Sequence, residues 1–249
     1  MKVAVGIPTY NRADMVRINA RYLSRSRLTS DITLFVVDDA STEYDVVFLR
    51  EVYPAGTDIQ RRDQNSGGAD FAAYDLLNRL VATEADVLVL LDSDLIVSRE
   101  FMVKTLELLP LAKGILSLFN TPAHAAVGSH GPFLLKKTVG AAGTVWPRRL
   151  AVETLAGVPP GWDWDWRFSD FLSRRSRNQK GVRRLSNNHP RLSGQFWMIR
   201  RFTSAQIVPA NAGARVRTHW VQAITARPLC QKIFPPQRQF APKMSRVSP

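Results

Sequence analysis

Two carboxylates one residue apart, Asp92 and Asp94, follow the apolar run 87–91. On an extended chain alternate side chains point to the same side, which leaves the two acids about 7 Å apart at the backbone. Like charges at that separation raise each other's pKa unless a cation neutralises them. Mg²⁺ and Mn²⁺ bind through one or two carboxylates and complete their shell with phosphate oxygens and water. The spacing therefore predicts a divalent metal site; a loop that carries a helix cap is the alternative.

Three further polar clusters contain residue types that can bind a nucleotide. Asp38 and Asp39 close the apolar run 33–37, and carboxylates there can accept hydrogen bonds from a base or from ribose hydroxyls. Tyr10 and Arg12 follow the run 3–7 and could stack on and contact a nucleotide. The segment 65–68, Asn-Ser-Gly-Gly, precedes a helical pattern, where free backbone N–H groups can approach a phosphate or sugar. A strand cap, a plain turn and a simple helix entry are the respective alternatives.

The segment Gly-Trp-Asp-Trp-Asp-Trp at 161–166 combines aromatic rings with acids. An aromatic wall beside a carboxylate suits a sugar, because the CH faces of the sugar stack on the rings while the acid accepts a hydroxyl proton. Aromatic residues at such spacing also occur as core residues. We interpret the segment as a candidate sugar-binding and proton-accepting site.

These candidate residues lie in a chain that alternates short apolar runs with helical patterns. Expected strands cover 3–7, 33–39, 58–61, 86–92 and 115–119, with a further one at 196–199; expected helices cover 15–22, 71–81, 101–108 and 148–155. Repeated strand, helix, strand order predicts the α/β class, with a mostly parallel sheet covered by helices on both faces. Ligands gather at the carboxyl ends of such strands. We therefore expect the polar clusters to share one edge of the sheet.

Composition limits the class of protein. Of 249 residues, 45% are hydrophobic and 22% charged, which is typical of a globular chain. The lone Cys230 cannot form an internal disulfide, so we expect a reducing compartment and a cytoplasmic location. The first residues lack the features of an export signal, and no apolar run approaches the length of a membrane span.

The net charge of +13 is concentrated at one end of the chain. Residues 171–249 hold 16 Lys and Arg and none of the 21 acids. This segment could form a basic surface for an anionic lipid or glycan, at the inner face of a membrane. A disordered extension and the translation of a shifted reading frame are the alternatives. We expect a folded domain over 1–175, a poorly ordered basic extension over 176–249, and no nucleic-acid partner, because no recognised motif accompanies the charge.

Five motifs together resemble those of a known family. VAVGIPTYNR, LFVVDDAST, NSGGADFAAYDLL, VLVLLDSDLIV and GWDWDW are similar, in order, to the motifs of family 2 glycosyltransferases with the GT-A fold, over roughly residues 1–175. The resemblance implies a Rossmann-like sheet flanked by helices. It also implies that a sugar moves, with inversion, from a nucleoside diphosphate to a hydroxyl of a glycan, lipid-linked or protein acceptor, with Mn²⁺ or Mg²⁺ as cofactor.

The resemblance also assigns roles to residues. Asp94 and Asp92 would hold the metal. The Glu-Asp motif of the family, in which Asp is the base, is replaced here by Asp163-Trp164-Asp165, so the resemblance favours Asp163 as base, with Asp165 second. Trp162 and Trp164 would face the acceptor, and His189 is a weak match to a further metal ligand. The residues expected to hold the nucleotide sugar are Pro8, Tyr10, Arg12, Asp38, Asp39, Asn65, Gly67, Asp92 and Ser93.

Two other functions fit parts of the pattern. A nucleotidyltransferase shares the sheet and the acid pair, but it normally opens with a Gly-rich loop where this chain has PTYNR. A sugar-nucleotide-binding protein without turnover, or an impaired enzyme, fits the unusual C-terminal segment. Neither a Walker A motif nor a GxGxxG fingerprint occurs, which argues against ATPase and dehydrogenase functions.

Overall fold

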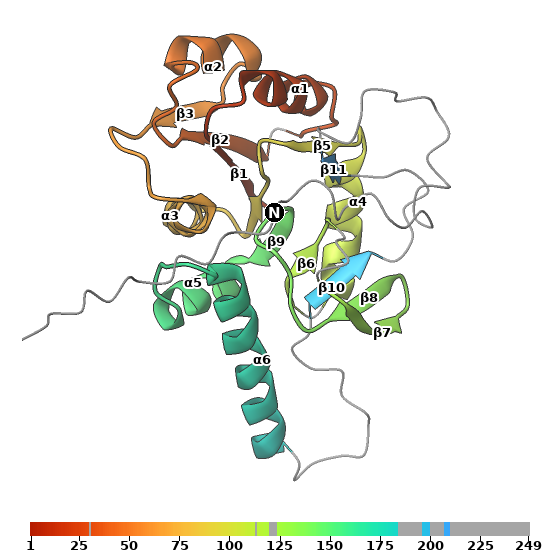
Figure 1. The fold of residues 1–249 in the computed structure, drawn as a ribbon. Coiled ribbons are helices and arrows are strands. Elements are labelled where there is room, and N and C mark those ends of the chain that lie inside the picture. Colours follow the sequence, from red (N-terminus) through yellow and green to blue (C-terminus); the bar gives the residue numbers. More distant parts are fainter. Residues whose placement is uncertain (30, 113, 120–123, 184–195, 200–206, 210–249) are drawn as a thin grey trace, which may run out of the picture. The chain divides into compact units, whose positions relative to one another are not determined.

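The computed structural model describes residues 1–29, 31–112, 114–119, 124–183, 196–199 and 207–209 (Figure 1). The chain divides into two compact units, Met1–Val216 and Arg217–Pro249, of which the second lies outside the described residues. The strands are β1 (Val3–Thr9), β2 (Ile32–Asp38), β3 (Asp58–Arg61), β4 (Val87–Leu90), β5 (Leu95–Val97), β6 (Leu116–Ser117), β7 (Ala126–His130), β8 (Phe133–Lys136), β9 (Thr144–Pro147), β10 (Phe196–Ile199) and β11 (Ile207–Pro209). The helices are α1 (Ala13–Ser24), α2 (Val46–Val52), α3 (Ala69–Ala82), α4 (Phe101–Leu108), the 3₁₀ turn η1 (Leu109–Leu111), α5 (Arg148–Gly157) and α6 (Trp164–Arg183).

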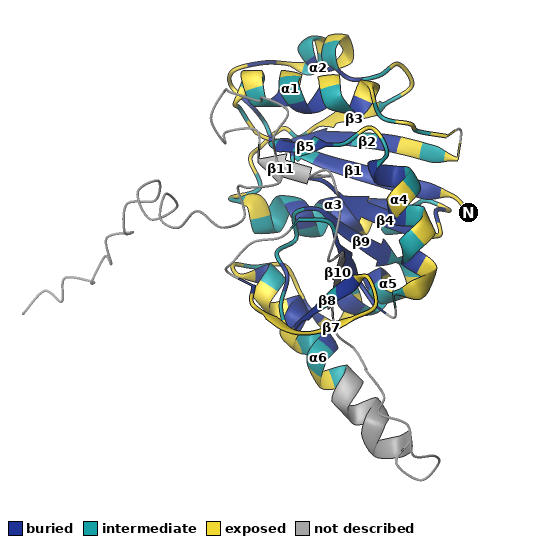
Figure 2. Cartoon of the chain, turned by 90° about the vertical axis from the view of Figure 1, so that its right-hand side faces the viewer, coloured by how far each residue is buried: buried dark blue, intermediate teal, exposed yellow. Residues whose placement is uncertain are grey.

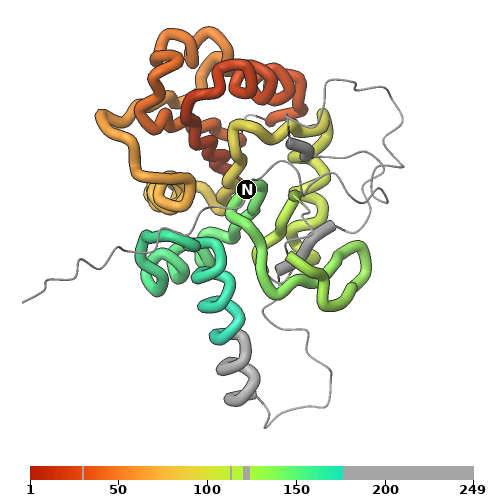
Figure 3. Tube along the Cα trace, in the orientation of Figure 1, coloured from red at the N-terminus to blue at the C-terminus, as the bar shows by residue number. Residues whose placement is uncertain are grey.

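The central sheet has the strand order β3-β2-β1-β4-β9-β6-β10-β8-β7. β1 pairs in parallel with β2 and with β4, and β2 pairs in parallel with β3. β9 enters antiparallel between β4 and β6, so a segment from the middle of the chain lies beside β4 at the centre of the sheet (Figure 3). β5 pairs separately with β11. The expected α/β class with a mostly parallel sheet is confirmed.

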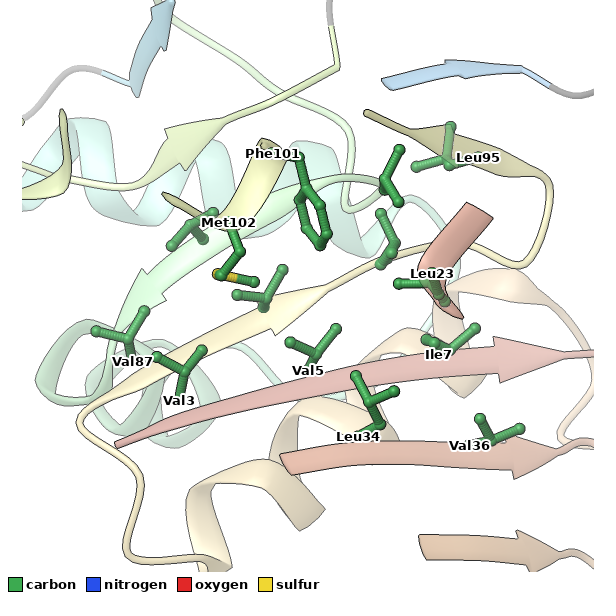
Figure 4. Close-up of a cluster of buried hydrophobic side chains, with 14 of the residues drawn as sticks. Val3, Val5, Ile7, Leu23, Leu34, Val36, Val87, Leu95, Phe101 and Met102 are labelled. Carbon is green, nitrogen blue, oxygen red and sulfur yellow. The ribbon is translucent and has the colours of Figure 1, made fainter. Parts of the chain in front are cut away.

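Helices cover both faces of this sheet because β1 alternates its side chains between two apolar clusters. Val3, Val5 and Ile7 point into the cluster formed with α1, α2 and α4 (Figure 4). Ala4 points into the opposite cluster, which α3, α5 and α6 complete. Burial is deepest along β1, β4 and β9 in the middle of the sheet (Figure 2). The loops that follow β1 and β4 therefore start from the most deeply buried strands of the sheet.

Close packing of α3 on β1 depends on one glycine. A Cβ atom at Gly6 would lie 2.8 Å from Cγ of Leu76, which is closer than real Cβ contacts. Glycine at this position lets α3 approach the sheet, and the first residues of α3 reach the edge where β1 ends.

Several expected elements are confirmed, and others were not foreseen. The expected strands at 58–61 and 196–199 match β3 and β10, and the expected helix at 148–155 matches α5. β10 joins the central sheet between β6 and β8, while α6 continues past residue 175. The proposed domain limits of 1–175 and 176–249 stay a prediction. α2 and the β7–β8 hairpin were not predicted. Among the described residues, no helix has the length and apolar character that crossing a membrane requires.

Candidate active site

The loops that follow β1, β2 and β4 meet at a pocket of about 290 Å³. Every residue that the sequence assigned to the nucleotide sugar contributes to its wall, except Asp38. The wall consists of Pro8, Thr9, Tyr10, Arg12, Asp39, Asn65, Gly67, Gly68, Ala69, Ala72, Asp92 and Ser93. Segments far apart in sequence meet here because parallel strands end at the same edge of a sheet.

Asp39 holds the 65–68 turn, which forms part of the pocket wall, through hydrogen bonds. Its carboxylate is buried and accepts hydrogen bonds from Asn65 Nδ2 at 3.0 Å and from Ser66 N and Oγ at 2.9 and 2.7 Å. Arg62 Nε lies 3.5 Å from Asp39 Oδ1. These contacts use the acceptor positions of the carboxylate. Asp39 therefore fixes the 65–68 turn, and its partner Arg62 was not predicted from the sequence.

Asp38 is a structural acid. Its side chain is fully buried, accepts from Ser41 Oγ at 2.5 Å and N at 3.1 Å, and pairs with Arg61 Nη1 at 2.8 Å. Neighbouring residues of a strand point to opposite faces, so only one of the two acids can reach the pocket. Asp38 does not line the pocket, in contrast to the expectation.

The loop after β1 is held in an uncommon backbone conformation. Asn11 and Arg12 have φ angles of 50° and 57°, and Ala40 in the loop after β2 has 61°. Asn11 Oδ1 accepts from Thr42 N at 2.8 Å, which ties the two loops together. Such strained residues persist where surrounding contacts hold them, and they gather at functional sites. In the loop held in this way, Tyr10 lines the pocket and is 46% exposed.

Asp92 lines the pocket, and Asp94 lies next to it through its ion pair with Arg12 of the pocket wall. Burial raises the pKa of Asp92 to about 7, and the charge of Asp94 adds to the effect. Arg12 Nη1 lies 3.0 Å from Asp94 Oδ2 and supplies part of the missing positive charge. Among the described residues no group of three or more His, Cys, Asp or Glu side chains is placed to hold a metal. Two carboxylates beside an open pocket fit a hard cation that takes its remaining ligands from phosphate and water.

The Trp-Asp-Trp-Asp-Trp segment adjoins the same pocket through α3. The Trp162 ring is 68% exposed, packs edge-on against Phe71, and would lie 3.2 Å from a Cβ at Gly68 in the pocket wall. Asp163 has a φ of 57°, and its N–H donates to Asp70 Oδ2 at 3.0 Å. The segment is thus attached to the first turn of α3, whose Ala69 lines the pocket, and Asp163 is exposed.

Trp164 is a core residue. It is fully buried and packs against Trp146 and Phe168, with ring centroids 6.4 and 4.9 Å away. Trp164 is the first residue of α6, and residues two apart on a helix point in different directions. The three tryptophans therefore do not share a face. Of the two rings expected on the acceptor side, Trp162 alone reaches the surface. Trp166, which is 47% exposed, belongs to the segment marked in the sequence, although no separate role was assigned to it.

Asp165 differs from Asp163 in its surroundings. Burial raises the pKa of Asp165, and the nearby charges of Asp70 and Asp163 raise it further. Its Oδ1 atom accepts from Trp166 N at 2.7 Å. A carboxylic acid with a raised pKa is suited to accepting a proton near neutral pH. His189, the weak candidate for a metal ligand, lies outside the described residues.

Comparison with known proteins agrees with this geometry. Residues 4–115 match the family model described as glycosyl transferase family 2, so the resemblance seen in the sequence is confirmed. No curated protein sequence matches the chain.

Solved structures share the fold. S. aureus TarS 1–349 superimposes with a TM-score of 0.55 at 14% identity, over 83% of this chain and 60% of that one. The same TarS fragment in complex with UDP-GlcNAc gives 0.56 at 15%, over 83% and 58%. The Pyrobaculum calidifontis mannosyltransferase PcManGT, in complex with GDP-Man and Mn²⁺, gives 0.51 at 20%, over 70% and 52%. The chain thus spans about 60% of the TarS fragment, and these TM-scores, at such low identities, show a common GT-A fold and no more.

Proposed function

We propose that the chain, whose residues 4–115 match glycosyl transferase family 2, transfers a sugar from a nucleoside diphosphate to an acceptor hydroxyl. The observation that carries the proposal is a pocket in which the loops after β1, β2 and β4 meet at Asp92, beside the Arg12–Asp94 ion pair. The nucleotide sugars named in the two neighbouring complexes, UDP-GlcNAc and GDP-Man, support the same class of donor.

The pocket offers each part of such a donor a suitable partner. Tyr10 supplies an exposed ring for a base, and the 65–68 turn supplies small residues and backbone N–H groups. Arg12 brings positive charge to the side where the diphosphate would lie. We assign Asp92 and Asp94 as ligands of Mn²⁺ or Mg²⁺, which, when bound, supplies charge that stabilises the leaving diphosphate.

The proposed reaction is a single displacement. The acceptor oxygen forms a bond to the anomeric carbon while the bond from that carbon to the β-phosphate oxygen breaks. The bonding electron pair leaves with the nucleoside diphosphate, and the hydroxyl proton passes to a carboxylate of the Asp163–Asp165 segment. General-base assistance of this kind contributes about 10²- to 10⁴-fold. Attack from the face opposite the leaving group inverts the anomeric centre.

Donor binding is tested by thermal unfolding with UDP, GDP or dTDP, with and without Mn²⁺. A ligand at one hundred times its Kd stabilises by about 2.7 kcal/mol, which corresponds to a rise of about 5 to 10 °C in Tm. We expect that rise only when Mn²⁺ is present, and we expect Asp94→Ala to remove it. Asp58→Ala, at an exposed acid outside the pocket wall, is the matched control. Identical Tm values with every nucleotide and metal contradict the proposal.

Turnover separates the enzyme from its alternative, a sugar-nucleotide-binding protein without catalysis. The measurement is the release of UDP from UDP-GlcNAc or of GDP from GDP-mannose, with Mn²⁺ and a mixture of glycan acceptors. Metal-dependent release supports the transferase. Metal-dependent binding with no release in either case supports the non-catalytic alternative.

A further inference from the structure

One polar side chain interrupts the buried face of α1. This face consists of Val16, Asn19, Ala20 and Leu23, and Asn19 is fully buried. An amide that is taken out of water costs free energy unless hydrogen bonds in the protein replace those to water. The partners of Asn19 therefore indicate why an amide stands at a position that would otherwise suit an apolar residue.

The Asn19 side chain donates to the turn that carries the two acids. Nδ2 donates to the carbonyl oxygen of Leu95 at 2.7 Å and to that of Asp92 at 3.4 Å. The turn is closed by its own backbone, because Leu95 N donates to Asp92 O at 3.1 Å. One NH₂ group thus contacts the carbonyls at both ends of the segment 92–95, which contains Asp94.

Tyr53 determines which way the Asn19 amide points. Its hydroxyl is buried at the end of α2 and donates to Asn19 Oδ1 at 3.1 Å. Burial raises the pKa of Tyr53, so the hydroxyl keeps its proton and remains a donor. A flipped amide would direct its oxygen at two carbonyl oxygens, which are acceptors only. The hydroxyl and the carbonyls therefore select the same orientation of the amide.

The start of α1 reaches the turn at a second point. Arg12, which precedes α1, lines the pocket, and its Nη1 atom lies 3.0 Å from Asp94 Oδ2. Arg12 thus contacts the carboxylate side of the turn, while Asn19 contacts its backbone side. Because both residues belong to one short stretch of chain, the position of α1 and the position of the two acids are linked.

We infer that Asn19, oriented by Tyr53, is a positioning residue that holds the turn 92–95 in the conformation in which Asp92 and Asp94 bind the divalent cation. The inference rests on the proposed function and adds two residues to it. Neither residue belongs to the described pocket wall, so both act through the backbone of the turn. Replacing a partner that orients metal ligands in this way typically lowers metal affinity about 10- to 100-fold.

The first test needs no metal. Hydrogen exchange of the Leu95 amide, followed by NMR, measures how firmly the turn is closed on Asp92. Tyr53→Phe keeps the ring in the core and removes only the hydroxyl, and we expect exchange about threefold to tenfold faster. Asn19→Leu removes every amide contact and should speed the exchange further. If Asn19→Leu does not fold, Tyr53→Phe decides this test.

Thr105→Val is the matched control. Thr105 is fully buried on α4, and its hydroxyl donates to Phe101 O at 2.7 Å within the same helix. The variant removes a buried hydrogen bond of similar strength without altering a contact of the turn. Exchange of the Leu95 amide should therefore match that of the unmodified chain. Equal exchange rates in Tyr53→Phe and in this control overturn the inference.

The second test measures the affinity for the metal. Electron paramagnetic resonance follows free Mn²⁺ during a titration of the chain with UDP, GDP or dTDP present. We expect Mn²⁺ to bind about 10- to 100-fold more weakly to Asn19→Leu and about threefold to tenfold more weakly to Tyr53→Phe. A purely structural role would leave the affinity of the folded chain unchanged, as we expect for Thr105→Val.

The two tests separate this inference from the proposed function. If the unmodified chain binds Mn²⁺ and both variants bind it equally well, the positioning role is refuted and the metal site stands. If the unmodified chain binds no Mn²⁺ with any nucleotide, the proposed function fails. Exchange of the Leu95 amide then decides by itself whether Asn19 and Tyr53 hold the turn.

Discussion

Asp38 and Asp39 are neighbours in sequence, yet their side chains serve different parts of the molecule. Asp38 is buried and paired with Arg61, and Asp39 fixes the 65–68 turn at the pocket. Their type and their place at a strand end predict polar chemistry at that edge. Which of the two reaches the ligand depends on the strand's pleat relative to the pocket, which the sequence alone does not define. The same reasoning applies to Trp164, whose burial depends on the angle at which α6 begins.

The raised pKa of Asp165 predicts how the rate of nucleoside diphosphate release depends on pH. A base must be ionised to accept a proton, so the rate of nucleoside diphosphate release should rise with pH through the raised pKa of Asp165. Asp165→Asn should lower the rate about 10²-fold or more and remove this rise, while metal-dependent nucleotide binding is kept.

Asp163→Asn is the matched comparison, and it should retain the rise with pH. An Asp165→Asn protein with undiminished release and the same profile would show that Asp165 is not the base.

At the scale of elements, α3 connects the sheet to the site. Its first turn lines the pocket at Ala69 and holds the Asp163 backbone through Asp70. Its apolar periodicity made the helix predictable. The contact with Asp163 spans more than ninety residues of sequence and has no local signature. The β7–β8 hairpin was missed for a different reason: β7 is exposed along its whole length and lacks the alternation that marks a strand.

Gly6→Ala tests how closely α3 must approach β1. The added methyl would overlap Leu76, so we expect a loss of about 1 to 3 kcal/mol in the free energy of unfolding, measured by urea denaturation. Gly128→Ala, in an open position, should change it by less than about 0.5 kcal/mol. Equal stabilities for Gly6→Ala and the unmodified chain would show that the helix can shift at no cost.

Asp75 on α3 provides a second test of this element. Burial alone would raise the pKa of Asp75, but hydrogen bonds and charge from Arg79 and Arg62 outweigh it and lower the pKa. A lowered native pKa contributes stability above the unfolded pKa, and this stability is lost as pH falls through the native one. Asp75→Asn should therefore cost up to about 1 kcal/mol at pH 7 and progressively less below pH 4, in urea titrations. A cost that is independent of pH would contradict the ion-pair account.

At the scale of the whole molecule, charge and fold are distributed differently. The acids end at Asp170, yet β10 and β11 beyond it pair with strands that precede Asp170. The short apolar run at 196–199 made β10 predictable. Its position between β6 and β8 was not, because strand order in a mixed sheet is set by long-range pairing. The basic segment that follows lies mostly outside the described residues.

The concentration of charge predicts binding to anionic membranes. With 16 Lys and Arg and no acid in residues 171–249, the full chain should sediment with vesicles that contain phosphatidylserine. It should dissociate as ionic strength rises, because salt screens such attraction. Vesicles of phosphatidylcholine alone are the control. Equal sedimentation with both kinds of vesicle, or with neither, would contradict an electrostatic membrane contact.

The central claim is that a divalent cation joins Asp92 and Asp94 to the diphosphate of a nucleotide in the pocket after β1, β2 and β4. Anomalous diffraction at the manganese edge, from crystals grown with Mn²⁺ and UDP or GDP, measures this directly. We predict one manganese peak within about 2.5 Å of a carboxylate oxygen and a phosphate oxygen, with the base beside Tyr10. A nucleotide bound elsewhere, or a pocket that holds neither ion nor nucleotide under saturating conditions, would contradict the account.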